Sequence, residues 1–165
     1  MTIAAITAEW EHIALWGLAA TVTMTVVLQG SQSAGLTRLS LSFLLGTMIT
    51  GRRSRASVVG FLAYMLGGWL FAGFYFLLMF HLDIQTWWLG AILGLIHALF
   101  LLVAVLPILP YFHPRMASEY EGPSELRRLE PPGFMGLNYG YRTPLTTLAG
   151  HMLYGAILGV AYGLI

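Results

Sequence analysis

The sequence predicts an all-α polytopic membrane protein, a helical bundle of four transmembrane helices with one short interfacial helix. Three observations lead to this fold class. Hydrophobic residues make up 58% of the 165 residues and charged residues only 9%, whereas a soluble domain carries about 25% charged residues. The apolar residues gather in four stretches close to the roughly 20 residues that a spanning helix needs. The basic residues fall in only two of the segments between these stretches.

Composition also excludes several classes of site. The chain has no cysteine, which removes disulfides, thiolate metal sites and cysteine nucleophiles together. Its formal net charge of +1 gives no reason to expect nucleic acid as a partner. The first residues, MTIAAITAEWEH, contain Glu9 and Glu11 but no basic residue, so they lack the positive start of a cleaved signal peptide. We expect the first helix to remain in the mature protein.

The elements are predicted in chain order as follows. The four spans are residues 12–28, 57–80, 87–109 and 144–165. Pro107 and Pro110 mark the end of the third span, since proline interrupts a helix interior, and Pro144 suits the first turn of the fourth. The apolar stretch 36–50 is too short to span. We interpret it as an interfacial helix, with a re-entrant segment as the alternative. Residues 1–165 then form one integral-membrane domain.

The basic residues are all arginines, and they set the predicted orientation. Four lie between the first and second spans and four lie in the loop 111–142, while the link HLDIQT and both termini have none. They are Arg38, Arg52, Arg53, Arg55, Arg115, Arg127, Arg128 and Arg142. The positive-inside rule then places both arginine-bearing loops in the cytoplasm, with the N- and C-termini outside. We therefore expect a multi-pass protein of the bacterial inner (cytoplasmic) membrane.

The cytoplasmic loop 111–142 is the longest polar segment. Within it, SELRRLE is predicted to form about two turns of surface helix, and the turn-rich stretch PPGFMGLNYG is expected to lie back on the membrane face. The loop is either a connection or a docking surface for a partner. His113 and Arg115 are candidate contacts for a lipid headgroup phosphate. A plain juxtamembrane anchor is the alternative role for this pair.

Histidine and glycine share a helix face in each of the last two predicted spans. Glycines follow His151 at every fourth position of the fourth span, and His97 lies seven residues after the first glycine of a similar row in the third. Small residues at this spacing let a second helix approach closely. We therefore predict that the third and fourth spans pack through their glycine faces. The predicted packing residues are Gly90, Gly94, Gly155, Gly159 and Gly163.

The two histidines are candidate buried polar or ligand residues, because an ionisable group inside a membrane is a functional hypothesis by default. Their distances from the cytoplasmic ends of the spans differ by roughly 7 Å, so direct pairing of His97 with His151 requires tilt or a local irregularity. Three roles stay open: a neutral hydrogen bond across the interface, a place on a proton or solute path, and bis-histidine haem ligation. No carboxylate lies inside a predicted span, so a histidine base has no embedded acid partner.

Several strings in a fixed order also resemble a known family. They are GLAATVTMTVVL, GAILGLIHALFLLVAVLPILP, HPRM and PPGFMGLNYGYRTPLTTLAGHMLYGAILGVAYG. This order resembles a family of small four-span bacterial and archaeal integral membrane proteins of unknown function, with GLNYG and GHMLYG as the most specific parts. The resemblance covers most of the chain and implies fold and location only. It assigns no catalytic residue.

Three classes of function follow from these features. The first is a non-catalytic accessory or scaffold subunit, which docks on a larger membrane complex or self-associates through glycine-rich helix faces. The second is a small oligomeric transporter or channel with His97 and His151 on its path. The third is a membrane protein that binds haem or another cofactor. We favour the first, and so expect no enzyme, no cofactor and no metal. The expected partners are the lipid bilayer and other membrane subunits or further copies of the chain.

Overall fold

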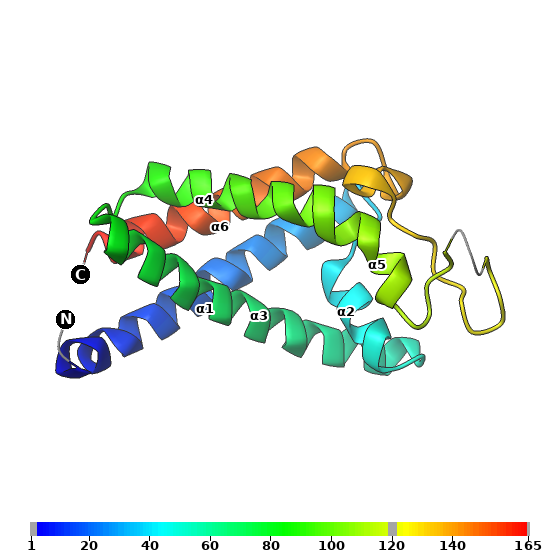
Figure 1. The fold of residues 1–165 in the computed structure, drawn as a ribbon, viewed down its shortest axis with the longest axis horizontal. Helices are drawn as coiled ribbons and strands as arrows, with labels where there is room; N and C mark the ends of the chain where they lie inside the picture. The colour runs from blue at the N-terminus through cyan, green and yellow to red at the C-terminus, as the bar shows by residue number, and fades with distance from the viewer. Residues whose placement is uncertain (1–2, 119–121, 165) are drawn as a thin grey trace. The chain divides into compact units, whose positions relative to one another are not determined.

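The computed structural model describes residues 3–118 and 122–164, with side chains from Trp10 onward. Residues 119–121 of the predicted loop, Ile165 of the predicted fourth span and the side chain of Glu9 lie outside this description. The elements are α1 (Ile3–Ser33), α2 (Leu41–Ile49), α3 (Arg53–Leu82), α4 (Trp87–Phe100), η1 (Leu101–Val105), α5 (Leu106–Phe112), η2 (Phe134–Tyr139) and α6 (Thr143–Tyr162) (Figure 1). Within the described ranges the secondary structure is helical apart from one isolated β-bridge.

Four helical segments are long and apolar enough to cross a bilayer, which confirms the predicted all-α, multi-pass fold. They are Trp10–Ser33, Arg53–Leu82, Trp87–Phe112 and Thr143–Tyr162. The first two extend beyond the predicted spans, because a helix does not have to end where its apolar residues end. The last stops at Tyr162, before the weak helix former Gly163.

The third span does not end at its prolines, so that prediction is wrong. The helix passes Pro107 and Pro110 and reaches Phe112. A π-helical turn, η1, makes this possible: the Leu106 N–H bonds to the Leu101 carbonyl, five residues earlier. Such a turn shifts the backbone just before Pro107, where a proline ring would otherwise meet the carbonyl four residues back.

The predicted interfacial helix is shorter than expected. Helix α2 covers Leu41–Ile49 only, and it begins where the Ser40 side chain accepts a hydrogen bond from the Phe43 N–H. The preceding residues are not helical because they pair with another segment: the Arg38 N–H bonds to the Tyr139 carbonyl, with N and O 2.7 Å apart. Helix α2 is half-buried, since Leu44 is buried while Ile49 is exposed.

The chain divides into two compact units. Unit 1 contains Met1–Val27, Met65–His97 and Leu148–Ile165, and unit 2 contains Leu28–Tyr64 and Ala98–Thr147. The four long helices contribute residues to both units. All eight arginines belong to unit 2. The division into two compact units does not test the prediction that residues 1–165 form one domain.

Small residues bring helices together within each unit. In unit 1, a Cβ added at Gly17 of α1 would lie 2.7 Å from the Ala72 Cβ of α3. In unit 2, Gly46 of α2 faces the Ala56 carbonyl of α3, and Gly60 of α3 faces the Ser42 carbonyl of α2, both too closely for any Cβ. Glycine is therefore required where α2 lies against the start of α3.

Candidate functional site

The two histidines of the last spans meet in unit 1. Their ring centroids lie 5.0 Å apart, with the planes at 80°. Phe71 of α3 stacks on His97 at 4.2 Å between centroids, and the Tyr75 hydroxyl lies 3.3 Å from His97 Nδ1. His151 is 3% exposed. The offset expected from sequence therefore does not keep the rings apart.

This histidine cluster continues into tyrosines that hold α6 against α3. The Tyr75 and Tyr154 rings meet edge to face at 5.5 Å, and the Tyr154 hydroxyl donates to the Gly68 carbonyl over 2.6 Å. One turn on along α3, the Tyr162 hydroxyl donates to the Ala72 carbonyl over 2.7 Å. Tyr154 and Tyr162 thus satisfy their hydroxyls on a helix backbone, whereas the Tyr75 hydroxyl lies beside His97.

The predicted packing glycines lie where α4 and α6 run side by side (Figure 1). A Cβ at Gly90 would collide with the Gly155 carbonyl, and one at Gly94 with the His151 carbonyl. A Cβ at Gly159 would collide with the Thr86 carbonyl, just before α4. Further along, a Cβ at Gly163 would lie 2.8 Å from the Gln85 carbonyl oxygen. These positions do not tolerate a side chain without a shift of the backbone.

Bis-histidine haem ligation does not suit this geometry. A macrocycle held by both His97 and His151 would lie between α4 and α6, whose backbones already meet at Gly94. In the part of the chain that the structure describes, no three His, Cys, Asp or Glu side chains gather closely enough to hold a metal ion. The cluster is best described as a polar and aromatic contact between helices.

His113, a predicted headgroup contact, is buried in unit 2 with 1% exposure. Its Nδ1 accepts a hydrogen bond from the Arg115 N–H over 3.1 Å. Its Nε2 lies 3.1 Å from the Leu44 carbonyl and 3.2 Å from the Thr47 hydroxyl, so Nε2 must carry the proton. The ring is therefore held as the neutral Nε2–H tautomer. Burial first, and the Arg115 charge second, lower the pKa of His113, although the Leu44 carbonyl opposes them.

Arg115, the second predicted headgroup contact, binds the end of α2. Its Nη1 donates to the Thr47 carbonyl over 2.6 Å and to the Met48 carbonyl over 3.2 Å. These belong to the last turn of the helix, whose carbonyls have no partner within the helix. The HPR segment after α5 thus holds the end of α2, and the Arg115 guanidinium is already engaged there.

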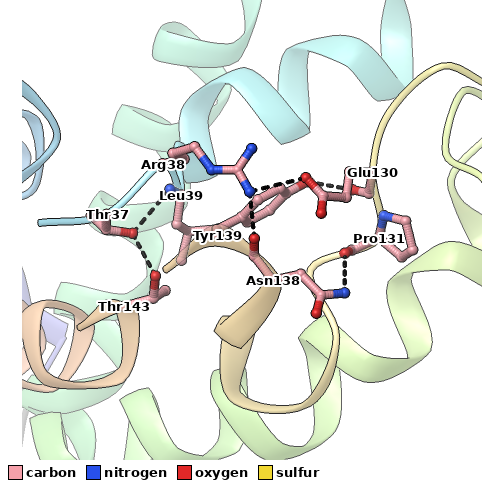
Figure 2. A network of polar contacts seen from close by, with 8 residues as sticks. All are labelled: Thr37, Arg38, Leu39, Glu130, Pro131, Asn138, Tyr139 and Thr143. Carbon is pink, nitrogen blue, oxygen red and sulfur yellow. Dashed lines mark hydrogen bonds and ion pairs between the residues drawn. The ribbon is translucent and has the colours of Figure 1, made fainter. Parts of the chain in front are cut away.

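A second network joins the two arginine-bearing loops (Figure 2). The Thr37 and Thr143 hydroxyl oxygens lie 2.7 Å apart, and the Arg38 Nη2 donates to the Asn138 carbonyl over 2.6 Å. The same guanidinium forms an ion pair with Glu130 at 3.2 Å. We call this region, residues 34–40 together with 130–143, the lobe. Because the loops touch, they lie at the same end of the helices, as the arginine pattern predicts.

The GLNYG string belongs to the lobe and explains its shape. Gly136 has a φ of +69° and Gly140 a φ of +132°, conformations that side chains disfavour. The Tyr139 hydroxyl donates to the Glu130 carbonyl over 2.5 Å, and the Asn138 side-chain amide donates to the Pro131 carbonyl over 2.9 Å. Burial, and then the Glu130 charge, raise the pKa of Tyr139 to about 12 against the opposing charge of Arg38.

The surface of the lobe carries large apolar side chains outside the spans. Phe134 is 59% exposed, Leu137 48% and Tyr141 75%. The residues between and beside them, Pro131, Asn138 and Tyr139, belong to the network just described. Figure 2 shows the hydrogen bonds that join Asn138 to Pro131 and Tyr139 to Glu130. Fixed backbone with exposed apolar side chains is typical of an interaction surface.

The surface helix predicted over SELRRLE is wrong. In residues 122–130 the chain is extended or turned rather than helical. The Arg127 N–H bonds to the Ser124 hydroxyl over 3.1 Å, and the Leu129 N–H bonds to the Arg115 carbonyl over 3.0 Å. The backbone groups that a helix would use are thus paired with other partners.

The sequence missed Thr37, Arg38 and Thr143 as members of a site. Arg38 entered the prediction only as a topology signal, because its main partners are backbone carbonyls, which leave no mark in a sequence. The strings GLNYG and HPRM did point to the right segments. The chain matches no protein-family model, no curated protein and no solved structure. The resemblance described above therefore rests on its quoted strings.

Proposed function

We propose that the protein is a non-catalytic accessory or scaffold subunit, which docks on a larger membrane complex through the lobe. The observation that carries the proposal is the surface of Phe134, Leu137 and Tyr141, which is apolar, exposed and held on a fixed backbone. Ordering a loop costs about 1–2 kcal/mol of backbone entropy per residue. A mere connection between spans gives no reason for so many hydrogen bonds.

The polar groups of both clusters support a structural rather than a reactive role. His113 and Arg115 are engaged with α2, and Tyr154 and Tyr162 beside the histidine cluster bind helix carbonyls. Apart from Glu11 at the start of the first candidate span, the four candidate spans contain no carboxylate. We therefore propose that the protein is not an enzyme.

The lobe is a better docking surface than the glycine faces. The glycines of α4 and α6 already meet each other within the chain, so we propose that they pack these two helices. Self-association through the same glycines would first have to separate α4 from α6. Association with further subunits is therefore assigned to the lobe.

We propose that the lobe lies in the cytoplasm and that the membrane is a bacterial inner membrane. The support is the positive-inside rule applied to two loops that touch each other. Because the chain lacks cysteine, single cysteines placed within residues 122–142 report on this directly. They are expected to resist an impermeant thiol reagent in intact cells and to react after permeabilisation. Labelling in intact cells would reverse the orientation.

The docking proposal is tested by purification of the full chain from its native membrane in mild detergent, followed by mass measurement of the intact particle. We expect a second protein in fixed stoichiometry. Phe134→Asp and Tyr141→Asp should release it with unchanged melting temperature, whereas Leu126→Asp, at an exposed loop position outside the lobe, should retain it. A particle containing only this chain, or retention by the lobe variants, would contradict the proposal.

A second candidate function is a proton or solute path through the histidine cluster. The observation that favours it is the contact of His97 with both His151 and the Tyr75 hydroxyl. Its test is proton flux in vesicles that contain the purified chain. Flux that is lost in His97→Phe but kept in the exposed variant His81→Phe would favour transport. Absence of flux in the wild-type chain would leave the cluster as a packing contact.

A further inference from the structure

A shallow, open groove beside the start of α3 lies outside both sites described above. It has a volume of about 470 Å³ and is lined by Thr50, Ser54, Arg55, Val58 and Val59, all within unit 2. One end of the groove is therefore cationic and hydroxyl-bearing, and the other is apolar. Arg55, Val58 and Val59 are three and four residues apart, so they share one side of the helix.

Among the residues that the structure describes, no carboxylate pairs with the positive charge at this groove. Arg52, Arg53 and Arg55 are exposed, and none of them forms an ion pair with a described carboxylate. No acidic residue occurs in the sequence between Glu11 and Asp83. The headgroup role predicted for Arg115 is less suited to an anion, because that guanidinium already binds the Thr47 and Met48 carbonyls.

We propose that this groove binds an anionic phospholipid of the bilayer. Arg55 pairs with the phosphate, the Thr50 and Ser54 hydroxyls bond to its oxygens, and the first carbons of an acyl chain lie along Val58 and Val59. The exposed surface of α3 stays apolar beyond the groove, since Val58 is 62% exposed and Leu62, one turn later, is 61% exposed. A soluble anion would leave that apolar side without a partner, whereas a lipid matches both parts. Basic residues next to a span attract anionic lipids.

The test compares lipid retention by the full chain in detergent, measured by native mass spectrometry with phosphatidylglycerol and phosphatidylcholine of equal chain length. The wild-type chain should retain phosphatidylglycerol in preference to phosphatidylcholine. Arg55→Gln should lower that retention by about fivefold, the effect of one surface cation on an anionic lipid. Arg128→Gln, which removes an exposed arginine far along the sequence in the loop, should leave it unchanged.

Two further measurements separate the groove from general charge attraction. Val58→Trp should fill the groove and lower retention while keeping every charge, and Val103→Trp, at another exposed valine, should not. Excess inorganic phosphate should not displace the lipid. Equal retention of both lipids, equal loss in Arg55→Gln and Arg128→Gln, or displacement by phosphate would each overturn the proposal.

Discussion

The contacts inside unit 1 and the contacts inside unit 2 differ in their chemistry. In unit 1, α4 and α6 meet backbone to backbone at glycines, and aromatic rings fill the remaining contacts around His97 and His151. In unit 2, side chains reach across to backbone carbonyls: Arg115 binds the end of α2, and Arg38 binds the carbonyl of Asn138. Both units contain close-packed glycines, Gly46 and Gly60 in unit 2 among them, but unit 2 adds arginine side chains that bind the backbone carbonyls of a helix end and a loop.

The difference follows from where the backbone is already satisfied. Residues of unit 1 lie mostly in long helices, whose carbonyls bond within the helix, so close packing contributes to stability there together with a few tyrosine hydrogen bonds. Unit 2 contains the end of α2 and the loops around it, whose backbone groups need partners from elsewhere. Arginine, histidine and threonine side chains supply them.

The largest effect is expected at one of the close glycine contacts of unit 1. Gly159→Leu should lower the free energy of unfolding by about 3 kcal/mol, because its side chain meets the Thr86 carbonyl rather than a movable group. Gly73→Leu is the matched control, since a Cβ there meets nothing within 4 Å. Unfolding in mixed detergent measures both variants. Equal unfolding free energies of Gly159→Leu and Gly73→Leu would contradict the close glycine contact in unit 1.

The next effect concerns the clamp on α2. His113→Ala removes a buried ring and leaves the Arg115 N–H and the Leu44 carbonyl without it, which should cost about 2–3 kcal/mol. Hydrogen exchange is expected to speed up at the amides of α2 before those of α6. His81→Ala, at an exposed position, should leave both unchanged. Uniform acceleration in both helices would mean that the clamp is not local to unit 2.

Acid should weaken the same clamp without any substitution. Since the pKa of His113 lies below its usual 6.5 in the folded protein, the unfolded chain takes up the proton first as the pH falls. The stability that the neutral ring contributes is therefore complete above about pH 6.5. This contribution to stability decreases as the pH falls below that value, and the decrease continues until the pH has passed the lowered pKa of folded His113. Because intrinsic amide exchange itself slows as the pH falls, the quantity to compare is the protection factor, which at α2 should decrease from pH 7.5 to 5.5 in the wild-type chain and less so in His113→Gln. If the protection of the α2 amides does not change with pH, the neutral His113 ring does not stabilise the end of α2.

The smallest effect is expected at the surface of the lobe. The Arg38 and Glu130 side chains are 67% and 49% exposed, so their ion pair is screened by water. Glu130→Gln should change the free energy of unfolding by less than about 1 kcal/mol, and the Arg38 bond to the Asn138 carbonyl should survive. A change as large as that of His113→Ala would show that the lobe depends on charge.

These contrasts also explain how far the sequence alone could go. The four spans were predictable, because apolar composition and length act along one element, whereas the contact of the His97 and His151 rings was expected only with tilt or a local irregularity. The path of the chain through Pro107 and the extended course of SELRRLE were not. Each depends on a particular backbone hydrogen-bond partner, the Leu101 carbonyl in the first case and the Arg115 carbonyl in the second. Because every residue carries the same carbonyl, the sequence does not indicate which one is used.

The most direct test of the account is a cross-link between the two arginine-bearing loops. Thr37→Cys combined with Thr143→Cys places two thiols where the hydroxyl oxygens lie 2.7 Å apart, in a chain with no other cysteine. Mild oxidation in native membranes should join them almost completely, with no shift in the single-cysteine controls. Failure of the folded double variant to cross-link would contradict the lobe and the docking surface built on it.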